Sequence, residues 1–402
     1  MTMRQLRILV APSPFDNKLR PEKIADCIEE GIRRVLPEKS AFIHKVPLYN
    51  GGDHFSQTLL SFYGGEIRNI SINSPFYSPI QSHLGFIDGG NTAVLDVAAA
   101  AGRQFIVEGL PDPTATTSYG IGELFTAALD SGCKKIIFDC NDSIAVDGGA
   151  GMLQALGARL LDAYCRDIVT IGGGSELSRL EAIDMSHIHP RLHDQDIRIE
   201  VLYYTDIELC GYAGVAERVG RASFEQTARL ESALEQYARV ARKILREDVG
   251  HKPGSGVCGG LGTALMLLGA QFRSRFNSGH EYFDLETLFD KQWDLVITGV
   301  GLSPSQFPSM ARKLAKLARR KHGMHVIAVV GTIEHERTAD LDDEEVSSYM
   351  AIPGSPTDEL IRDAAKGAMR MVQIGISLNQ GETESQVPGI KPWTAQLDVV
   401  IE

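Results

Sequence analysis

The sequence predicts an α/β fold, because apolar runs typical of buried strands alternate with segments of helical periodicity at both ends of the chain. Near the N-terminus the apolar run 6–11 ends at two prolines, and a helical pattern with proline in its first turn follows over 20–35. The same order returns late in the chain, with a strand over 294–298, a helix over 307–321 and a strand over 325–330. A strand, a loop and a helix in this order are typical of a parallel sheet covered by helices.

The middle of the chain has a different pattern. Strands are expected over 93–97 and 135–140, and helices over 121–131, 149–162 and 226–247. Glycine-rich turns are expected at 172–174 and 253–262, and a last helix over 356–378. Since the two ends share one pattern and the middle has another, the middle is predicted to be an inserted domain.

The predicted organisation is therefore two α/β domains with a ligand cleft between them. Residues 1–70 and 285–380 form one discontinuous, Rossmann-like domain, and residues 71–284 form the inserted domain. The tail 381–402 has too little periodicity to pack alone.

Composition narrows the class of function. The 402 residues are 43% hydrophobic and 23% charged, which is ordinary for a soluble globular protein. The net charge of −12 would repel a polyanion, so no nucleic-acid partner is expected. The six cysteines form no CxxC pair, and no apolar run reaches the roughly 18 residues of a membrane span. A cytoplasmic protein with reduced thiols and no membrane contact is expected.

Four glycine-rich segments suggest anion binding, although the GxxxxGK[ST] phosphate loop is absent. Backbone N–H groups of such segments, together with a helix N-terminus, can face a phosphate. Each segment alone is more often a turn, but four in one chain favour a phosphate or nucleotide cleft. The segments are NGGD (50–53), TTSYGIGEL (116–124), DGGAGMLQALG (147–157) and SGVCGGLGTAL (255–265).

The order of motifs resembles the type I glycerate kinases from residue 6 to about residue 379. The resemblance implies two α/β domains with the active site in the cleft between them, where the ATP γ-phosphate is transferred to a hydroxyl of D-glycerate with Mg²⁺ as cofactor. The motifs that carry it are ILVAPSPF, PLYNGGD, AVLDVAAAAG, TTSYGIGELFTAALDSG, DGGAGMLQALGARLLD, DMSHIHPRL and WDLVITGVGLSPSQ.

The chain departs from this family in the charged residues of the motifs. The lysine of the family's P-D-S-F-K-G-S stands here as Asp16, with Lys18 nearby. The family's D-G-G-E-G-T is NGGDHF, which contains Asp53 and His54. In G-G-S-A-T-N-D-G-G, two glycines that would let the backbone approach phosphate become Asn141 and Asp142.

The loop that follows the strand at 294–298 shows the same change. The family has G-E-G-R-[IL]-D-x-Q in this loop, and its two glycines are kept here as Gly299 and Gly301. Its Glu, Arg and Asp are replaced by Val300, Leu302 and Pro304. Phosphoryl transfer depends on cationic clamps, a metal-holding carboxylate and a group that orients the hydroxyl. Their joint replacement predicts that efficient ATP:D-glycerate phosphotransfer is lost.

Three functions stay open. In the first, the cleft is repurposed for another small-molecule ligand or reaction, with Asp16, Asp53, His54 and Asp147 as candidate catalytic groups. In the second, the chain is an active kinase of glycerate or a related hydroxy acid, and ATP and Mg²⁺ are its cofactors. In the third it is a non-catalytic binding or scaffold protein. A homodimer is a possible assembly in all three.

The active-kinase alternative assigns further residues. Asp147 and Asp206 would hold the metal, and Arg312 would be a nearby cation. The residues predicted to bind the cofactor are Ser143, Asp142, Gly148, Gly149, Lys18, Gly299 and Gly301.

Overall fold

The computed structural model describes two compact units, which together confirm the α/β class. The first unit consists of residues 1–46, 292–307 and 315–402, and the second of residues 47–291 and 308–314. Described within them are residues 5–13, 19–48, 55–106, 112, 114–193, 197–203, 205–220, 222–274, 282, 288–300, 309–331 and 346–381.

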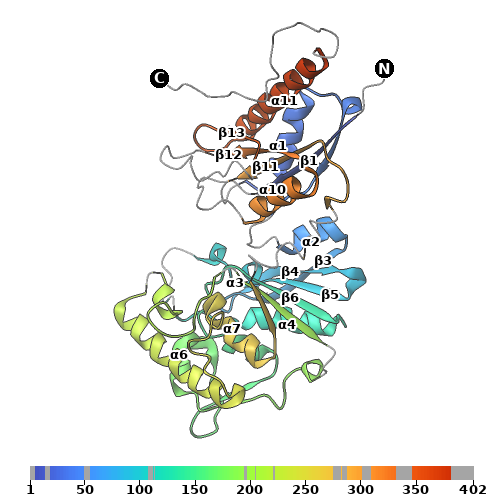
Figure 1. Cartoon of the computed structure of the whole chain (residues 1–402). Coiled ribbons are helices and arrows are strands. Elements are labelled where there is room, and N and C mark those ends of the chain that lie inside the picture. The colour runs from blue at the N-terminus through green and yellow to red at the C-terminus, as the bar shows by residue number, and fades with distance from the viewer. Residues whose placement is uncertain are drawn as a thin grey trace. The chain divides into compact units, whose positions relative to one another are not determined.

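The first unit is built on a five-stranded sheet with the order β13-β12-β11-β1-β2, in which every pair is parallel. Its strands are β1 (Leu6–Pro12), β2 (Ala41–Lys45), β11 (Leu295–Val300), β12 (His325–Val330) and β13 (Ser348–Ala351). Its helices are α1 (Pro21–Arg33), α10 (Ser309–His322) and α11 (Asp358–Gly381). Helices α1 and α11 lie side by side and pack with the sheet in one hydrophobic core (Figure 1).

Helix α1 forms because its apolar residues recur at helical spacing. Pro21 stands in the first turn, where its missing N–H costs nothing, and Ile24, Ile28 and Ile32 are buried at intervals of four. Gly31 faces α11, since a Cβ at this position would lie 2.3 Å from the carbonyl oxygen of Arg362. The glycine therefore permits the close packing of the two helices.

The second unit is built on a six-stranded mixed sheet with the order β10-β9-β6-β5-β4-β3. The pairs β3–β4 and β4–β5 are antiparallel, and the pairs from β5 through β6 and β9 to β10 are parallel. Its strands are β3 (Glu66–Asn73), β4 (Pro79–Ile87), β5 (Thr92–Asp96), β6 (Lys135–Cys140), β9 (Arg198–Tyr203) and β10 (Gln271–Ser274), and β7 (Arg159–Leu161) pairs separately with β8 (Ala182–Asp184).

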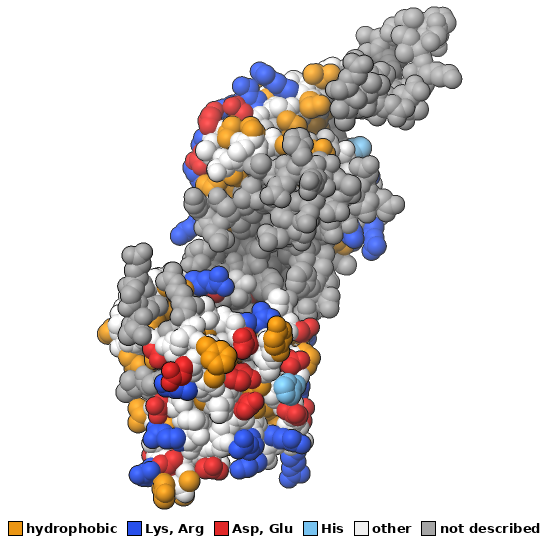
Figure 2. All heavy atoms as spheres, turned by 90° about the vertical axis from the view of Figure 1, so that its left-hand side faces the viewer, with side chains coloured by type: hydrophobic (Ala, Val, Ile, Leu, Met, Phe, Trp, Pro, Cys, Tyr) orange, Lys and Arg blue, Asp and Glu red, His pale blue; other side chains and the backbone are white. Residues whose placement is uncertain are grey.

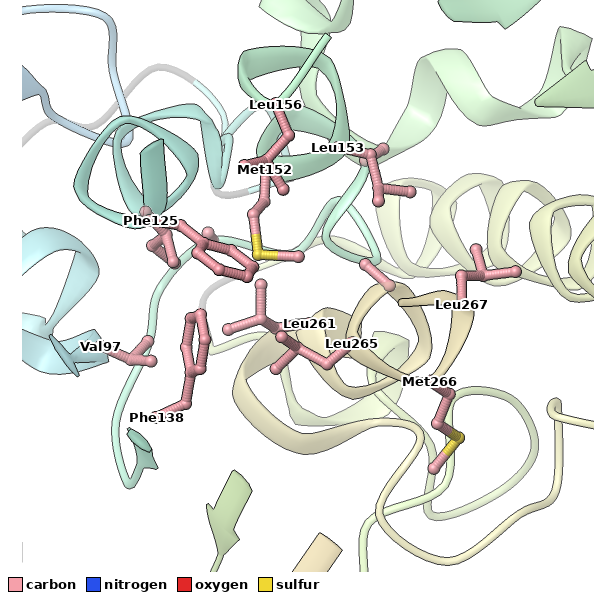
Figure 3. Packing of buried hydrophobic residues seen from close by; sticks show 14 of the residues in the cluster. Val97, Phe125, Phe138, Met152, Leu153, Leu156, Leu261, Leu265, Met266 and Leu267 are labelled. Atoms are coloured by element: carbon pink, nitrogen blue, oxygen red, sulfur yellow. The ribbon is translucent and has the colours of Figure 1, made fainter. Parts of the chain in front are cut away.

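Most helices of the second unit enclose its core on one face of this sheet, whereas α2 (Phe55–Tyr63) lies against the other face, at Gly85 of β4. Phe125 and Phe138 meet edge to face with ring centroids 4.9 Å apart, and Met152 and Leu261 lie beside them (Figure 3). The helices are α2 (Phe55–Tyr63), α3 (Val97–Ala101), α4 (Tyr119–Asp130), α5 (Ala150–Ala155), α6 (Phe224–Leu245) and α7 (Val257–Leu267). The 3₁₀ helices of the chain are η1 (Glu38–Ser40), η2 (Asp88–Gly90), η3 (Arg103–Phe105), η4 (Thr170–Arg179), η5 (Pro190–Leu192) and η6 (Ala216–Arg218).

Three sequence predictions differ from the structure. The helix expected over 149–162 ends at Ala155, because Gly157 adopts φ +101° and β7 follows. The turn expected over 253–262 already contains the start of α7. Residues 47–70, assigned from the sequence to the first domain, belong to the second unit, since β3 pairs along its length with β4.

Two of the predictions cannot be compared with the described residues. The predicted ligand cleft stays a prediction, and the predicted tail 381–402 lies outside the described residues from residue 382 onward. Within the described part of the chain, no helix is both long and apolar enough to cross a membrane. Charged side chains of both signs are interspersed over the visible surface in Figure 2.

Candidate functional site

Two loops of the first unit leave from neighbouring strand ends. Pro12 of β1 is the register partner of Gly299 in β11, and the Ser13 backbone N–H donates to the Gly299 carbonyl at 3.0 Å. The Thr298 hydroxyl donates to the Ala11 carbonyl at 2.8 Å. The segments after Ser13 and after Val300 therefore start side by side, at the sheet edge where α/β proteins bind ligands.

The predicted site residues within those segments and in the loop before α2 are not described. Asp16, Lys18, Asp53, His54 and Gly301 lie outside the described residues. Arg312 lies on α10, of which only the backbone is described at this position. Their predicted roles stay predictions.

In the second unit, Asp147 anchors the loop between β6 and α5. Its Oδ2 accepts hydrogen bonds from the Ser118 N–H (2.8 Å), the Ser118 hydroxyl (3.1 Å), the Thr117 hydroxyl (3.0 Å) and the Gly151 N–H (3.0 Å). Its Oδ1 accepts from the Gly149 N–H at 3.1 Å. The side chain is buried. These five donors tie the loop to the start of α4 and of α5, and four of them share Oδ2.

Gly148 and Gly149 are required by packing. Their φ angles are +66° and +80°, a region that favours glycine. A Cβ on Gly148 would lie 2.7 Å from the Tyr237 ring, and one on Gly149 would lie 2.5 Å from the Ala264 Cβ. Both positions face helices α6 and α7 of the core.

The exposed part of the same loop is held by side-chain contacts. The Asp142 carboxylate accepts from the Arg103 backbone N–H at 3.0 Å and from Arg103 Nε at 3.1 Å. The Ser143 hydroxyl accepts from the Ala145 N–H at 3.1 Å. Asp142, which stands where the resemblance places a glycine, is thus paired with Arg103 of the same unit.

Asp206 belongs to the segment after β9, the strand next to β6. It is exposed and follows β9, where it hydrogen-bonds to Tyr203. Burial, together with Asp206, raises the pKa of the Tyr203 hydroxyl. No group of three potential metal ligands gathers among the residues that the structure describes. The predicted role of Asp147 and Asp206 as metal ligands therefore stays a prediction.

A row of titratable side chains, which the sequence analysis missed, crosses the strand ends of the second sheet. Asp96 ends β5, and its register partner is Asp139 of β6. Both are buried on the face opposite to the hydrophobic core, since their neighbours Leu95 and Phe138 point into that core. His83 of β4 continues the row, with its Nε2 3.4 Å from Asp96 Oδ2.

This row holds the first turn of α2. Asp96 accepts from the Ser56 N–H at 3.0 Å and from the Ser56 hydroxyl at 2.6 Å. Gly85 of β4 allows the approach, because a Cβ there would lie 2.7 Å from Ser56 Cβ. Asp96 therefore fixes the position of the first turn of α2, which directly follows residues 50–54 in the sequence. The only signal in the sequence is a single carboxylate at the end of an apolar run.

The Cys258 thiol lies near this loop. A hydrogen bond with Cys140, reinforced by burial, raises the pKa of the Cys258 thiol well above its ordinary value. Cys258 lies in the glycine-rich start of α7 with φ +50°. A thiol that stays protonated is a poor nucleophile, so Cys258 is a structural group of the loop region.

Comparisons with known proteins give one consistent result. The sequence matches the glycerate kinase family over residues 8–376. It is 32% identical over 371 residues to the glycerate kinase of Bacillus subtilis (strain 168), which covers 90% of this chain and 94% of that protein. It is 35% identical over 336 residues to the glycerate 2-kinase of Escherichia coli (strain K12), covering 82% of this chain and 86% of that protein.

A solved structure agrees with these relatives. The crystal structure of "putative glycerate kinase 2 from Salmonella typhimurium LT2" superposes with a TM-score of 0.80 and is 30% identical. The match covers 93% of this chain and 100% of that chain. The similarity therefore extends over both compact units.

Proposed function

The chain belongs to the glycerate kinase family, and from this premise we propose that it no longer performs efficient ATP:D-glycerate phosphotransfer and instead uses the inherited site for another small molecule. The proposed ligand is rich in hydroxyl or amine groups and carries no polyphosphate. The proposal rests on the charges of the site loops.

One observation carries the proposal. Asp142 places a carboxylate, fixed by Arg103, in the loop after β6 where the resemblance expects a glycine next to phosphate. Two like charges 4 Å apart repel by about 1 kcal/mol in water and about 4 kcal/mol near a protein surface. Arg103 offsets part of this repulsion, but the Arg103 side chain is 80% exposed and also well screened. The loop is thus less suited to a polyphosphate than a glycine loop is.

The carboxylates at the strand ends support the class of ligand. Asp96 and Asp139 are buried side by side, and His83 adjoins Asp96. Carboxylates accept hydrogen bonds from hydroxyl and ammonium groups and repel phosphate oxygens. The predicted site residues Asp16, Asp53 and His54, which lie outside the described residues, are groups of the same kind.

An active kinase is the second candidate, and the extent of the similarity favours it. A sequence match over 94% of the Bacillus subtilis glycerate kinase is the specific observation on its side. In that case ATP and Mg²⁺ are the cofactors, and Asp147 and Asp206 are the predicted metal ligands. A scaffold without catalysis and a cytoplasmic location stay predictions.

A thermal-shift titration tests the proposal. The full chain is titrated with ATP·Mg²⁺, ADP·Mg²⁺, D-glycerate and a panel of polyols, amino alcohols and hydroxy acids, because a ligand that binds only the folded state raises Tm. We expect a shift with a member of the panel and none with millimolar nucleotide. A clear shift with either nucleotide contradicts the proposal and favours the kinase.

A further inference from the structure

Helix α11 has two apolar faces. One face, which includes Ala365, Ala368 and Met369, is buried against the sheet and α1. On the other face Met371 and Ile374 are 65% and 60% exposed. They stand three residues apart and therefore share one side of the helix.

The last turns of α11 also lack charge. The segment 371–381 reads MVQIGISLNQG and contains no charged residue. A helix that is apolar on more than one face is normally buried. The end of α11 therefore has the composition of an interface.

A groove adjoins this surface. Its volume is about 600 Å³, and it lies between the end of α11 and the sheet of the first unit. Its apolar lining includes Leu6, Ile8, Leu295, Met350, Val372 and Ile376. The exposed face of α11 and the groove form one continuous surface, because Met371 also lines the groove. We call it the α11 surface.

We propose that the α11 surface binds a second copy of this chain, in a two-fold symmetric dimer with antiparallel α11 helices. An axis between residues 372 and 373 places Met371 opposite Ile374 of the partner subunit, so one contact repeated twice covers both exposed side chains. A Cβ on Gly375 would meet no atom within 4 Å, so this position leaves room for the helices to approach.

Charge favours a second copy at this place. The chain has a net charge of −12, so two copies repel each other over most of their surfaces. Over residues 364–381 the only charged residues are Lys366 and Arg370, and there is no carboxylate. The exposed face of α11 is thus a place where two acidic copies meet without facing carboxylates of each other's helix, and among the described residues Asp294 is the one carboxylate in the lining of the adjoining groove.

The test compares oligomeric states of the full chain by sedimentation velocity and light scattering across the micromolar range. We expect a dimer for the wild type. The double variant Met371→Glu/Ile374→Glu should weaken it by roughly 30-fold or more, because two charges are forced into the contact. Ile244→Glu, at a position on α6 that is 39% exposed, is the matched control and should stay dimeric.

Other occupants give different results. A wild type that is monomeric throughout the range, or a double variant that is as dimeric as the wild type, overturns the proposal. Truncation after Gly381 tests whether the chain's own C-terminal segment covers the α11 surface instead of a second copy. We expect the truncated chain to remain a dimer. A full chain that is monomeric and dimerises only after truncation also overturns the proposal. If the double variant fails to fold, Ile374→Asn takes its place, and circular dichroism verifies the fold.

Discussion

The Asp142 carboxylate is held by Arg103 through two hydrogen bonds, from its backbone N–H at 3.0 Å and from its Nε at 3.1 Å. Asp142 follows β6, and Arg103 begins a 3₁₀ helix after α3. The contact therefore links the ends of two neighbouring strand–helix units of the second sheet. It places an anion where a glycine loop would leave the backbone open to phosphate.

Removal of the Asp142 charge should increase nucleotide affinity. Asp142→Asn keeps the shape of the side chain and should give a Tm shift with millimolar ATP·Mg²⁺ that the wild type does not show, because the repulsion of the phosphates is removed. Asp167→Asn is the matched control, because Asp167 pairs with Arg159 at 2.9 Å on the surface of the same unit. Both variants should lose at most about 1 kcal/mol of unfolding free energy. Equal Tm shifts in Asp142→Asn and wild type would remove the electrostatic argument.

Asp147 should prove to be a structural anchor. The Asp147 carboxylate accepts five hydrogen bonds, and Asp147→Asn replaces one of its oxygens with an NH₂ group that can only donate. This change should lower the free energy of unfolding by about 2–4 kcal/mol in urea titrations. Asp206→Asn, at an exposed position, should change it by no more than about 0.5 kcal/mol. Similar small effects for both variants would argue against the anchor.

Two glycines with the same backbone angle separate packing from strain. Gly149 and Gly132 have φ +80° and +81°, but a Cβ on Gly149 would lie 2.5 Å from Ala264 Cβ, whereas one on Gly132 would meet nothing within 4 Å. Gly132→Ala should cost about 1 kcal/mol through the left-handed angle alone. Gly149→Ala should cost about 3 kcal/mol or more. Equal losses in thermal or urea unfolding would show that the loop has room for a side chain.

Glu200 should make stability depend on acid pH. Burial acts to raise the pKa of Glu200, but hydrogen bonds from Tyr282 and Lys135 and the charge of Arg198 outweigh it and hold the pKa below its usual 4.5. A lowered pKa in the folded state stabilises the protein above about pH 4.5, and the contribution is lost as the pH falls through the folded value.

Glu200→Gln should therefore lower the unfolding free energy by about 2–4 kcal/mol at pH 7, because it breaks a buried ion pair. The gap to the wild type should narrow as the pH falls below about 4.5. Glu247→Gln, which removes an exposed pair with Lys252, should cost about 0.5 kcal/mol or less. A gap that does not change with pH would contradict the assignment.

The sequence predicted the buried parallel strands well. The ranges expected for β6 and β12 agree with the structure, since strands covered on both faces read as continuous apolar runs. The half-exposed hairpin of β3 and β4 was missed because only one of its faces is apolar. The predicted resemblance to the glycerate kinases is confirmed by the match over residues 8–376.

The candidate site was predicted less completely. Asp142, Ser143, Asp147 and the two glycines were identified from motifs, but motifs do not show whether a carboxylate is saturated by its neighbours, as Asp147 is. Asp96 and Asp139 were missed because they come together only through the register of β5 and β6. That register is a tertiary property and leaves no spacing in the sequence.

The most direct test of the central claim is a phosphotransfer assay. Formation of phosphoglycerate from ATP and D-glycerate is followed by mass spectrometry, with the Bacillus subtilis glycerate kinase measured in parallel. Since loss of one clamp or metal ligand typically costs roughly 10²- to 10³-fold, we predict a kcat/KM at least about 10³-fold below that enzyme. A kcat/KM within about tenfold of it would contradict the proposal and establish the chain as an active kinase.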